Sequence, residues 1–489
     1  MSQDPLDPGE QNWEALLRSM LGEQGAQEAI AAMRAAGIDP SAMAQAAGLP
    51  SGGAELSVML SQIQHLMATG EDGPLNWSLA RDVSAQLVNQ GGDPTVTAAH
   101  AAEVTTALQT AELWLDTATD LPPSAGQRHA WSRADWVSHT LPTWQRLVEP
   151  VAASMVAAMQ QVIADQAEML EGHPLAAQLG NPATLLNKLG GAVMGMQIGH
   201  AVGTLAGEVF GTSDTGLPLA DSGTMALVPH NVLAFSEGLD VPEAEVRLFL
   251  ATREAAHARL FSHASWLGPQ LLAAVESYAG EIAIDTDAME QAVRDLDISD
   301  PEALREAMAG GMFAVGQTES QRAALQRLET MLALVEGWVE EVTAGAVAAH
   351  LPHAIPLREM MRRRRAAGGP AESTFASLVG LELRPRRLRE AATLWGEVAR
   401  HGGTAARDDL WAHPDLLPNA ADLDAPLEFV AARESAAAHE EDVDAALAQL
   451  LGSADEASGA GAAEKDEATG DGPSDEGPAE GGEPAGDDR

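Results

Sequence analysis

Helical periodicity is the feature that most constrains this chain. From Asn76 onward, nearly every segment repeats apolar residues with the 3.6-residue period of an amphipathic α-helix. A chain of 489 residues, 45% of them apolar, is also long enough to bury a large core. The sequence therefore predicts a mainly α-helical globular protein. The longest periodic segments include VTTALQTAELWLDTA, WVSHTLPTWQRLVEPVAASMVAAMQQVIADQ and QRAALQRLETMLALVEGWVEEVTAGAVAAHL.

Glycine recurs at every fourth position in GGAVMGMQIGHAVGTLAGEVFG, from Gly191 to Gly211. This spacing places the glycines along one stripe of a helix, where a missing side chain lets a second backbone approach closely. We therefore expect close helix packing here. A membrane span is disfavoured, because a run so rich in Gly and Ala gains little free energy on transfer into lipid. His200, in the same run, is expected to be a hydrogen-bonded core histidine.

One segment departs from the helical period. Residues 223–235, GTMALVPHNVLAF, favour β-structure, and Pro229 interrupts them. We predict a strand or a short hairpin in this segment. It could be an edge strand that binds substrate backbone beside an active-site cleft, or a small two-strand cover over helices. The residues alone favour the cover.

Changes in composition divide the chain into three parts. Residues 1–75 are predicted to form an N-terminal helical appendage and linker, and residues 76–452 a main helical domain with a small β element. Residues 453–489 contain no aromatic or β-branched apolar side chain. This acidic tail cannot recover the entropy lost on ordering, so it is predicted to be disordered.

Charge and cysteine content exclude several classes of function. The chain has no cysteine, so a metal site would need histidine and carboxylate ligands. A net charge of −44 disfavours contact with the phosphates of nucleic acid. The N-terminal MSQDPLDPGEQNWEALL has neither the basic nor the apolar region of a secretory signal. We therefore predict a cytoplasmic protein that binds neither nucleic acid nor membrane.

The stretch REAAHARLFSH, residues 253–263, differs at one position from a zinc-peptidase motif. In HExxH the two histidines lie one helical turn apart and share a zinc ion, and the glutamate is the general base. Glu254 fits the role of base and His257 that of ligand. Arg253 stands in place of the first histidine, and a guanidinium has no lone pair to give to a metal. Zinc would therefore bind with a ligand missing.

A third metal ligand has several candidates. His263 follows His257 by six residues, as in HExxHxxGxxH, but Leu260 stands where that motif has glycine. On a continuous helix His257 and His263 would be about 120° and about 9 Å apart, too far to share one ion. The alternatives are Glu276, Glu281 and His230.

Longer stretches resemble a known family. They are QIGHAVGTLAGEVFGTSDTGLPL, VPHNVLAFSEGLDVPEAEVRLFLATREAAHARLFSHASWL, PLREMMRRRRAAGGPAESTFASLVGLELRPRRLREAATLW and DDLWAHPDLLPNAADLDAPLEFV. Together they span Asn76–Val430, and they are similar to the zincin-like type-2 metallopeptidases of actinobacteria, commonly labelled zinc-dependent metalloproteases. The resemblance implies a mainly helical zincin-like fold, a zinc cofactor and a peptide or protein substrate. It also implies a catalytic base at Glu254 and a zinc ligand at His257.

Three hypotheses for function follow from these observations. The first is a zinc-dependent hydrolase or peptidase with a degenerate RExxH motif. The second is an inactive descendant that acts as a peptide- or protein-binding scaffold, in which Arg253 pairs with Glu254 or grips a carboxylate of the bound peptide. In the third, Arg253, Glu254 and His257 form an ordinary hydrogen-bonded cluster in a helical scaffold.

Arginines form one dense positive region in this acidic chain. We expect them to be helix-surface charges paired with surrounding acids, with binding of an anionic ligand or of the chain's own tail as the alternative. The residues are Arg362 to Arg365, Arg384, Arg386, Arg387 and Arg389.

Overall fold

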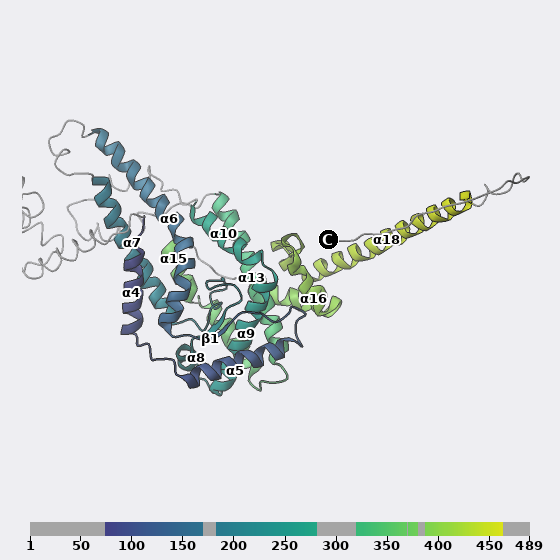
Figure 1. Cartoon of the computed structure of the whole chain (residues 1–489), viewed down its shortest axis with the longest axis horizontal. Coiled ribbons are helices and arrows are strands. Elements are labelled where there is room, and N and C mark those ends of the chain that lie inside the picture. The colour runs from purple at the N-terminus through teal and green to yellow at the C-terminus, as the bar shows by residue number, and fades with distance from the viewer. Residues whose placement is uncertain (1–73, 170–181, 281–318, 369, 380–386, 463–489) are drawn as a thin grey trace, which may run out of the picture. The chain divides into compact units, whose positions relative to one another are not determined.

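The computed structural model describes residues 74–169, 182–280, 319–368, 370–379 and 387–462 (Figure 1). These residues are mainly α-helical, which confirms the predicted fold class. Residues 1–73 of the predicted N-terminal appendage lie outside the described part. The described helices before residue 210 are α4 (Trp77–Gln90), α5 (Ala98–Leu115), α6 (Arg133–Met169) and α7 (Pro182–Ala206). The helices that follow are α8 (Pro229–Ser236), α9 (Glu243–His263), α10 (Leu267–Gly280), α13 (Glu319–Val347), α14 (Ala354–Ala366), α15 (Pro370–Val379), α16 (Leu388–Asp408), η1 (Asp409–Ala412), η2 (Pro414–Leu416), α17 (Ala420–Asp424) and α18 (Pro426–Ala462).

Two short parallel strands, β1 (Arg128–Ala130) and β2 (Met225–Leu227), form a small sheet. All three residues of β2 are buried, and its last residue, Leu227, also forms an antiparallel bridge with Gly211. The structure supports the two-strand cover and not an edge strand open to substrate. The prediction of strand beyond residue 228 is wrong, because Pro229 begins α8. Proline suits the first turn of a helix, where its missing N–H is not needed.

The glycine stripe packs α7 against α4, as expected. A Cβ atom added at Gly195 would lie 2.5 Å from the carbonyl oxygen of Asn76, and one at Gly199 would lie 2.5 Å from that of Ala80. Only glycine permits this separation of the two backbones. His200 is exposed, so the expectation of a core histidine is wrong. Glycine and apolar side chains, Ile198 among them, fill the buried face of α7 instead.

Helix α9 lies at the centre of the structure and is surrounded by other elements. It contacts α5, α13, α14, α8 and β2, and every residue from Phe249 to Phe261 is buried. A helix buried on all sides is normally apolar all round, yet this one carries four long polar side chains in its interior. Each of them must find a hydrogen-bonding partner on a neighbouring element. The four are Arg253, Glu254, His257 and Arg259.

The C-terminal part follows a compact unit that ends at Leu427. Helix α18 covers residues 453–462, so in those residues the structure has helix where the sequence predicts disorder. Four of these ten residues are alanine, the strongest helix former, which favours the helix here. The rest of the tail, residues 463–489, lies outside the described residues. Within the described ranges, no helix has both the length and the apolar character to cross a membrane.

Candidate functional site

Glu254 is held by the loop after α7 and by β2. Its Oε1 accepts hydrogen bonds from the backbone N–H of Thr212 (3.0 Å), the Thr212 hydroxyl and the backbone N–H of Ala226 (3.2 Å). Its Oε2 accepts from the backbone N–H and the hydroxyl of Ser213 (3.3 and 3.0 Å). A Cβ atom on Gly211 would lie 2.7 Å from Oε2, so glycine is needed for this close approach. The carboxylate therefore fixes the loop and the strand to α9.

Arg253 and His257 both contact a single carboxylate on α13, that of Glu336. The Arg253 Nη2 donates to Glu336 Oε2 at 2.8 Å, and the His257 Nε2 lies 3.1 Å from Glu336 Oε1. The other ring nitrogen of His257, Nδ1, lies 2.9 Å from the backbone carbonyl oxygen of Arg253, to which it donates when protonated. Arg365 of α14 also contacts Glu336 Oε1, at 3.0 Å. Together Arg253, His257, Arg365 and Glu336 form one ionic cluster. The Glu336 side chain in it is only 1% exposed.

The electrostatics of this cluster are set by competition between burial and charge. Burial acts to raise the pKa of Glu336, but Arg365, His257 and Arg253 together outweigh it. The pKa of the Glu336 carboxyl is consequently held well below its ordinary value. Burial is the largest influence on Arg253 and lowers its pKa, whereas Glu336 acts in the opposite direction. The cluster is stable as an ionised carboxylate surrounded by cations.

Arg259, about half a turn beyond His257, joins α9 to α5. Its guanidinium donates to the Glu112 carboxylate at 2.6 Å, to the backbone carbonyl of Leu121 at 3.0 Å and to Asp116 at 2.7 Å. These contacts lie away from Glu336 and fix the rotation of α9 about its axis. The orientation of the RExxH residues is therefore determined by partners on several elements.

The donor set does not fit zinc. In HExxH two imidazoles present lone pairs to the ion, but here the first position holds a guanidinium, which is itself a cation. His257 Nε2 and the Glu336 carboxylate offer two donors, and two arginines already neutralise that carboxylate. Structural and catalytic zinc sites have at least three protein ligands. Across the described residues, no group of three histidines or carboxylates has the geometry to hold a metal ion.

The other candidate ligands lie apart from this cluster. His263, the last residue of α9, is exposed, whereas His257 is buried. Glu276 lies on α10 and is 3.6 Å from Arg146. His230, at the start of α8, packs edge-on against His100. Glu281 falls outside the described residues.

Sequence reasoning did not find Glu336. It is far from the RExxH stretch in the sequence, and no motif spacing points to it. One signal was available, because MLALVEGWV is an apolar run interrupted by a single glutamate. A lone carboxylate inside a helix that is otherwise buried requires a cationic or hydrogen-bonding partner. The partners of Glu336 are Arg253 and His257, which the RExxH motif places one turn apart on α9.

The fold and this cluster define a class of protein: a mainly helical protein with a buried RExxH stretch on its central helix. The family model described as zincin-like metallopeptidase matches residues 75–430, and the chain belongs to that family. A search of curated protein sequences found no match. Among solved structures, the chain is similar to one from Chloroflexus aurantiacus, described as "a putative hydrolase with a novel fold". The two are 19% identical with a TM-score of 0.49, over 74% of this chain and 99% of that one.

Proposed function

We propose that this chain is a non-catalytic member of the zincin-like metallopeptidase family and acts as a peptide- or protein-binding scaffold. The observation that carries the proposal is the convergence of Arg253 and His257 on Glu336. His257 stands at the position of a zincin ligand, and the Arg253 guanidinium supplies beside it the positive charge that zinc would bring. Charge balance is thereby kept without a metal.

The surroundings of Glu254 support the same proposal. A general base must direct a lone pair at the proton that it removes. Both oxygens of Glu254 instead accept hydrogen bonds from Thr212, Ser213 and Ala226, in a residue that is 4% exposed. The carboxylate has the contacts of a structural group that anchors the loop and β2.

The alternative is a zinc-dependent hydrolase, in line with the metallopeptidase family to which the chain belongs. It would require Glu336 to leave Arg253 and Arg365 and to join His257 on a metal. A second carboxylate or histidine would also have to replace the ligand that is missing at Arg253.

Zinc content distinguishes the two functions. We expect the purified protein to hold far less than one zinc per chain after dialysis against a mild chelator, because two ligands bind zinc weakly. Arg253→His would add an imidazole to the donors of His257 and Glu336, which makes three ligands, and should raise zinc occupancy. Elemental analysis of both proteins provides the measurement. Near-stoichiometric zinc in the unmodified protein would contradict the scaffold proposal.

A double variant provides the matched control. Arg253→His combined with Glu336→Gln removes the third ligand, so its zinc occupancy should return to the low level of the unmodified protein. If the double variant kept the zinc of the single one, Glu336 would not be a ligand. Arg365 also contacts Glu336, so Arg253→His with Arg365→Gln should bind zinc more tightly than Arg253→His alone.

A further inference from the structure

Helix α14 has little apolar contact with the rest of the molecule. Two of its thirteen residues, Leu357 and Met361, are buried. Its neighbour α13, in contrast, buries a row of apolar side chains that includes Leu332, Val335, Trp338, Val339 and Val342. An element with few buried apolar contacts opens at a lower free energy than the core, while the rest of the protein stays folded. Apolar packing alone therefore holds α14 weakly.

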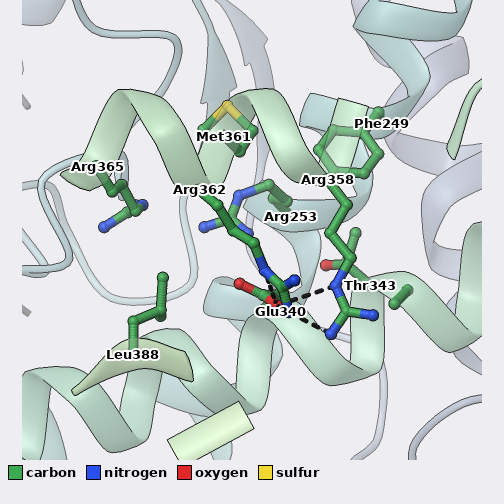
Figure 2. A pocket seen from close by; sticks show the side chains of 10 residues that line it. Phe249, Arg253, Glu340, Thr343, Arg358, Met361, Arg362, Arg365 and Leu388 are labelled. Atoms are coloured by element: carbon green, nitrogen blue, oxygen red, sulfur yellow. Dashed lines mark hydrogen bonds and ion pairs between the residues drawn. The ribbon is translucent and has the colours of Figure 1, made fainter. Parts of the chain in front are cut away.

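Charge holds α14 in place instead, since five of its thirteen residues are arginines. Arg358 and Arg362 both bind Glu340 of α13, the first at 2.9 Å, and Figure 2 shows the two side chains reaching the same carboxylate. Arg364 binds Asp214, in the loop after α7, at 3.2 Å. These three arginine side chains are 30%, 27% and 22% exposed, so they already lie near water. A guanidinium near water loses little when its ion pair opens.

The two ends of α14 suit an element that moves as a unit. At its start, the backbone N–H of His353 donates to Glu245 of α9 at 3.1 Å, and the ring Nδ1 of the same histidine lies 3.1 Å from that carboxylate. Beyond its end, Gly368 has a φ of +83°, which glycine adopts without strain. Small residues at the ends of elements commonly absorb the backbone rotation of a hinge. A polar contact thus bounds α14 on one side and a glycine on the other.

The last turn of α14 covers the RExxH residues. Arg365 reaches Glu336 Oε1 at 3.0 Å, and the same oxygen lies 3.1 Å from His257 Nε2. A cavity of about 20 Å³ beside His257 and Glu254 is also lined by Arg365 and by Asp214, which another arginine of α14 binds. Departure of α14 would therefore open this cavity to water and uncover the carboxylate that His257 contacts.

We propose that α14 is a lid, closed in this structure, that lifts as a unit and gives water and ligands access to Arg253, His257 and Glu336. Its ion pairs set the balance between the closed and open forms. The inference concerns access to the cluster, which a binding scaffold and a hydrolase would both need. The zinc measurements therefore neither support nor contradict it.

Hydrogen exchange of the full chain, followed by mass spectrometry, tests whether α14 opens on its own. Glu340→Gln removes the carboxylate that Arg358 and Arg362 share, so peptides from α14 should exchange about tenfold faster, in line with the loss of charge-assisted hydrogen bonds. Peptides from α5 should keep their exchange rates. Equal acceleration in α5 and α14 would mean that the helix opens only with the whole fold, and would overturn the proposal.

Two further variants make this test specific. Glu359→Gln is the matched control, because the ion pair of Glu359 with Arg363 lies within α14; its loss should change exchange of the helix by about twofold at most. Arg364→Gln, which removes the contact with Asp214, should open α14 as Glu340→Gln does and serves if that variant does not fold. Unchanged exchange of α14 in the folded variants would show that the ion pairs do not hold it.

Chemical labelling of histidines tests what the lid covers. Diethyl pyrocarbonate acylates accessible imidazoles; the His257 side chain is 3% exposed, whereas His263 on the same helix is exposed. We expect His257 to be labelled slowly in the unmodified protein and faster in Glu340→Gln and Arg364→Gln, in proportion to the exchange of α14. His263 should be labelled at one rate throughout. Faster exchange of α14 with no gain in labelling of His257 would identify a surface helix that covers nothing, and would overturn the proposal.

Discussion

At the scale of single residues, Glu336 joins elements that are distant in the sequence. Its carboxylate neutralises Arg253 and Arg365 and accepts the contact of His257. Glu336→Gln would leave these buried cations without a counter-ion, and removal of one partner of a buried ion pair costs about 3–5 kcal/mol. We expect the free energy of unfolding to fall by about that amount in urea titration. Glu341→Gln, at a more exposed neighbouring carboxylate, is the control and should change it by less than about 1 kcal/mol.

The same carboxylate predicts a dependence on pH. The pKa of Glu336 is lower in the folded protein than in the unfolded chain, where a glutamate titrates at about 4.3. Its contribution to stability is therefore complete above that value and is lost as the pH falls toward the folded pKa. The difference in stability between the unmodified protein and Glu336→Gln should be constant near neutral pH and shrink below about pH 4. Urea titrations between neutral pH and about pH 3 test this, and a difference that grows on acidification would contradict it.

Residue identity and spacing predicted part of this site. Arg253, Glu254 and His257 could be placed on one helix from the sequence, because the helical period fixes which residues are neighbours within an element. Their partners could not be placed, because Glu336 and the Thr212 loop are brought to α9 by tertiary packing alone. The role predicted for Glu254 also depended on those partners, since the hydrogen bonds that it accepts determine whether its oxygens are free.

At the scale of elements, the contact of α4 with α7 depends on glycine. At Gly199 an added Cβ would lie 2.5 Å from the carbonyl oxygen of Ala80 and 2.7 Å from the Cβ of Val83. Gly199→Ala should destabilise the protein by about 1–3 kcal/mol, because overpacking outweighs the gain in helix propensity. Gly190→Ala, in the same helix and with no atom within 4 Å of the added Cβ, should instead stabilise it by about 0.5–1 kcal/mol.

Thermal unfolding of the two glycine variants measures this difference. Equal effects of Gly199→Ala and Gly190→Ala would mean that α7 does not pack on α4 along the glycine stripe.

The stripe itself was predictable, because glycine repeated every fourth residue of a helix is typical of close contact with a second backbone. The choice of α4 as its partner was not, because the small residues of α4 that face the stripe, Ala80 and Ser84, have a spacing that recurs in other segments of this alanine-rich chain.

At the scale of the whole molecule, charge opposes compactness. A net charge of −44 causes self-repulsion, which salt screens over a Debye length that falls from about 30 Å at 0.01 M to about 8 Å at 0.15 M. We expect the urea midpoint of unfolding to rise between these two salt concentrations. The buried pairs at Glu336 and Glu112 are screened much less, so surface repulsion should dominate the change.

Two salts separate screening from specific ion effects. Sodium chloride and sodium sulfate at equal ionic strength should raise the midpoint similarly if screening is the cause. A midpoint that falls with salt would show that surface ion pairs, such as Arg363 with Glu359, contribute more than repulsion does.

The many distant partners of α9 also determine when this chain can fold during its synthesis. Arg259 needs Glu112, which the ribosome makes early, but Arg253 and His257 need Glu336, which emerges 83 and 79 residues after them. Until α13 has left the ribosome, burial of α9 would place the Arg253 guanidinium in the core without a counter-ion and His257 without its carboxylate partner. A nascent chain that ends at residue 318 should therefore remain open to proteolysis, and protection should appear only after Glu336 is exposed from the exit tunnel.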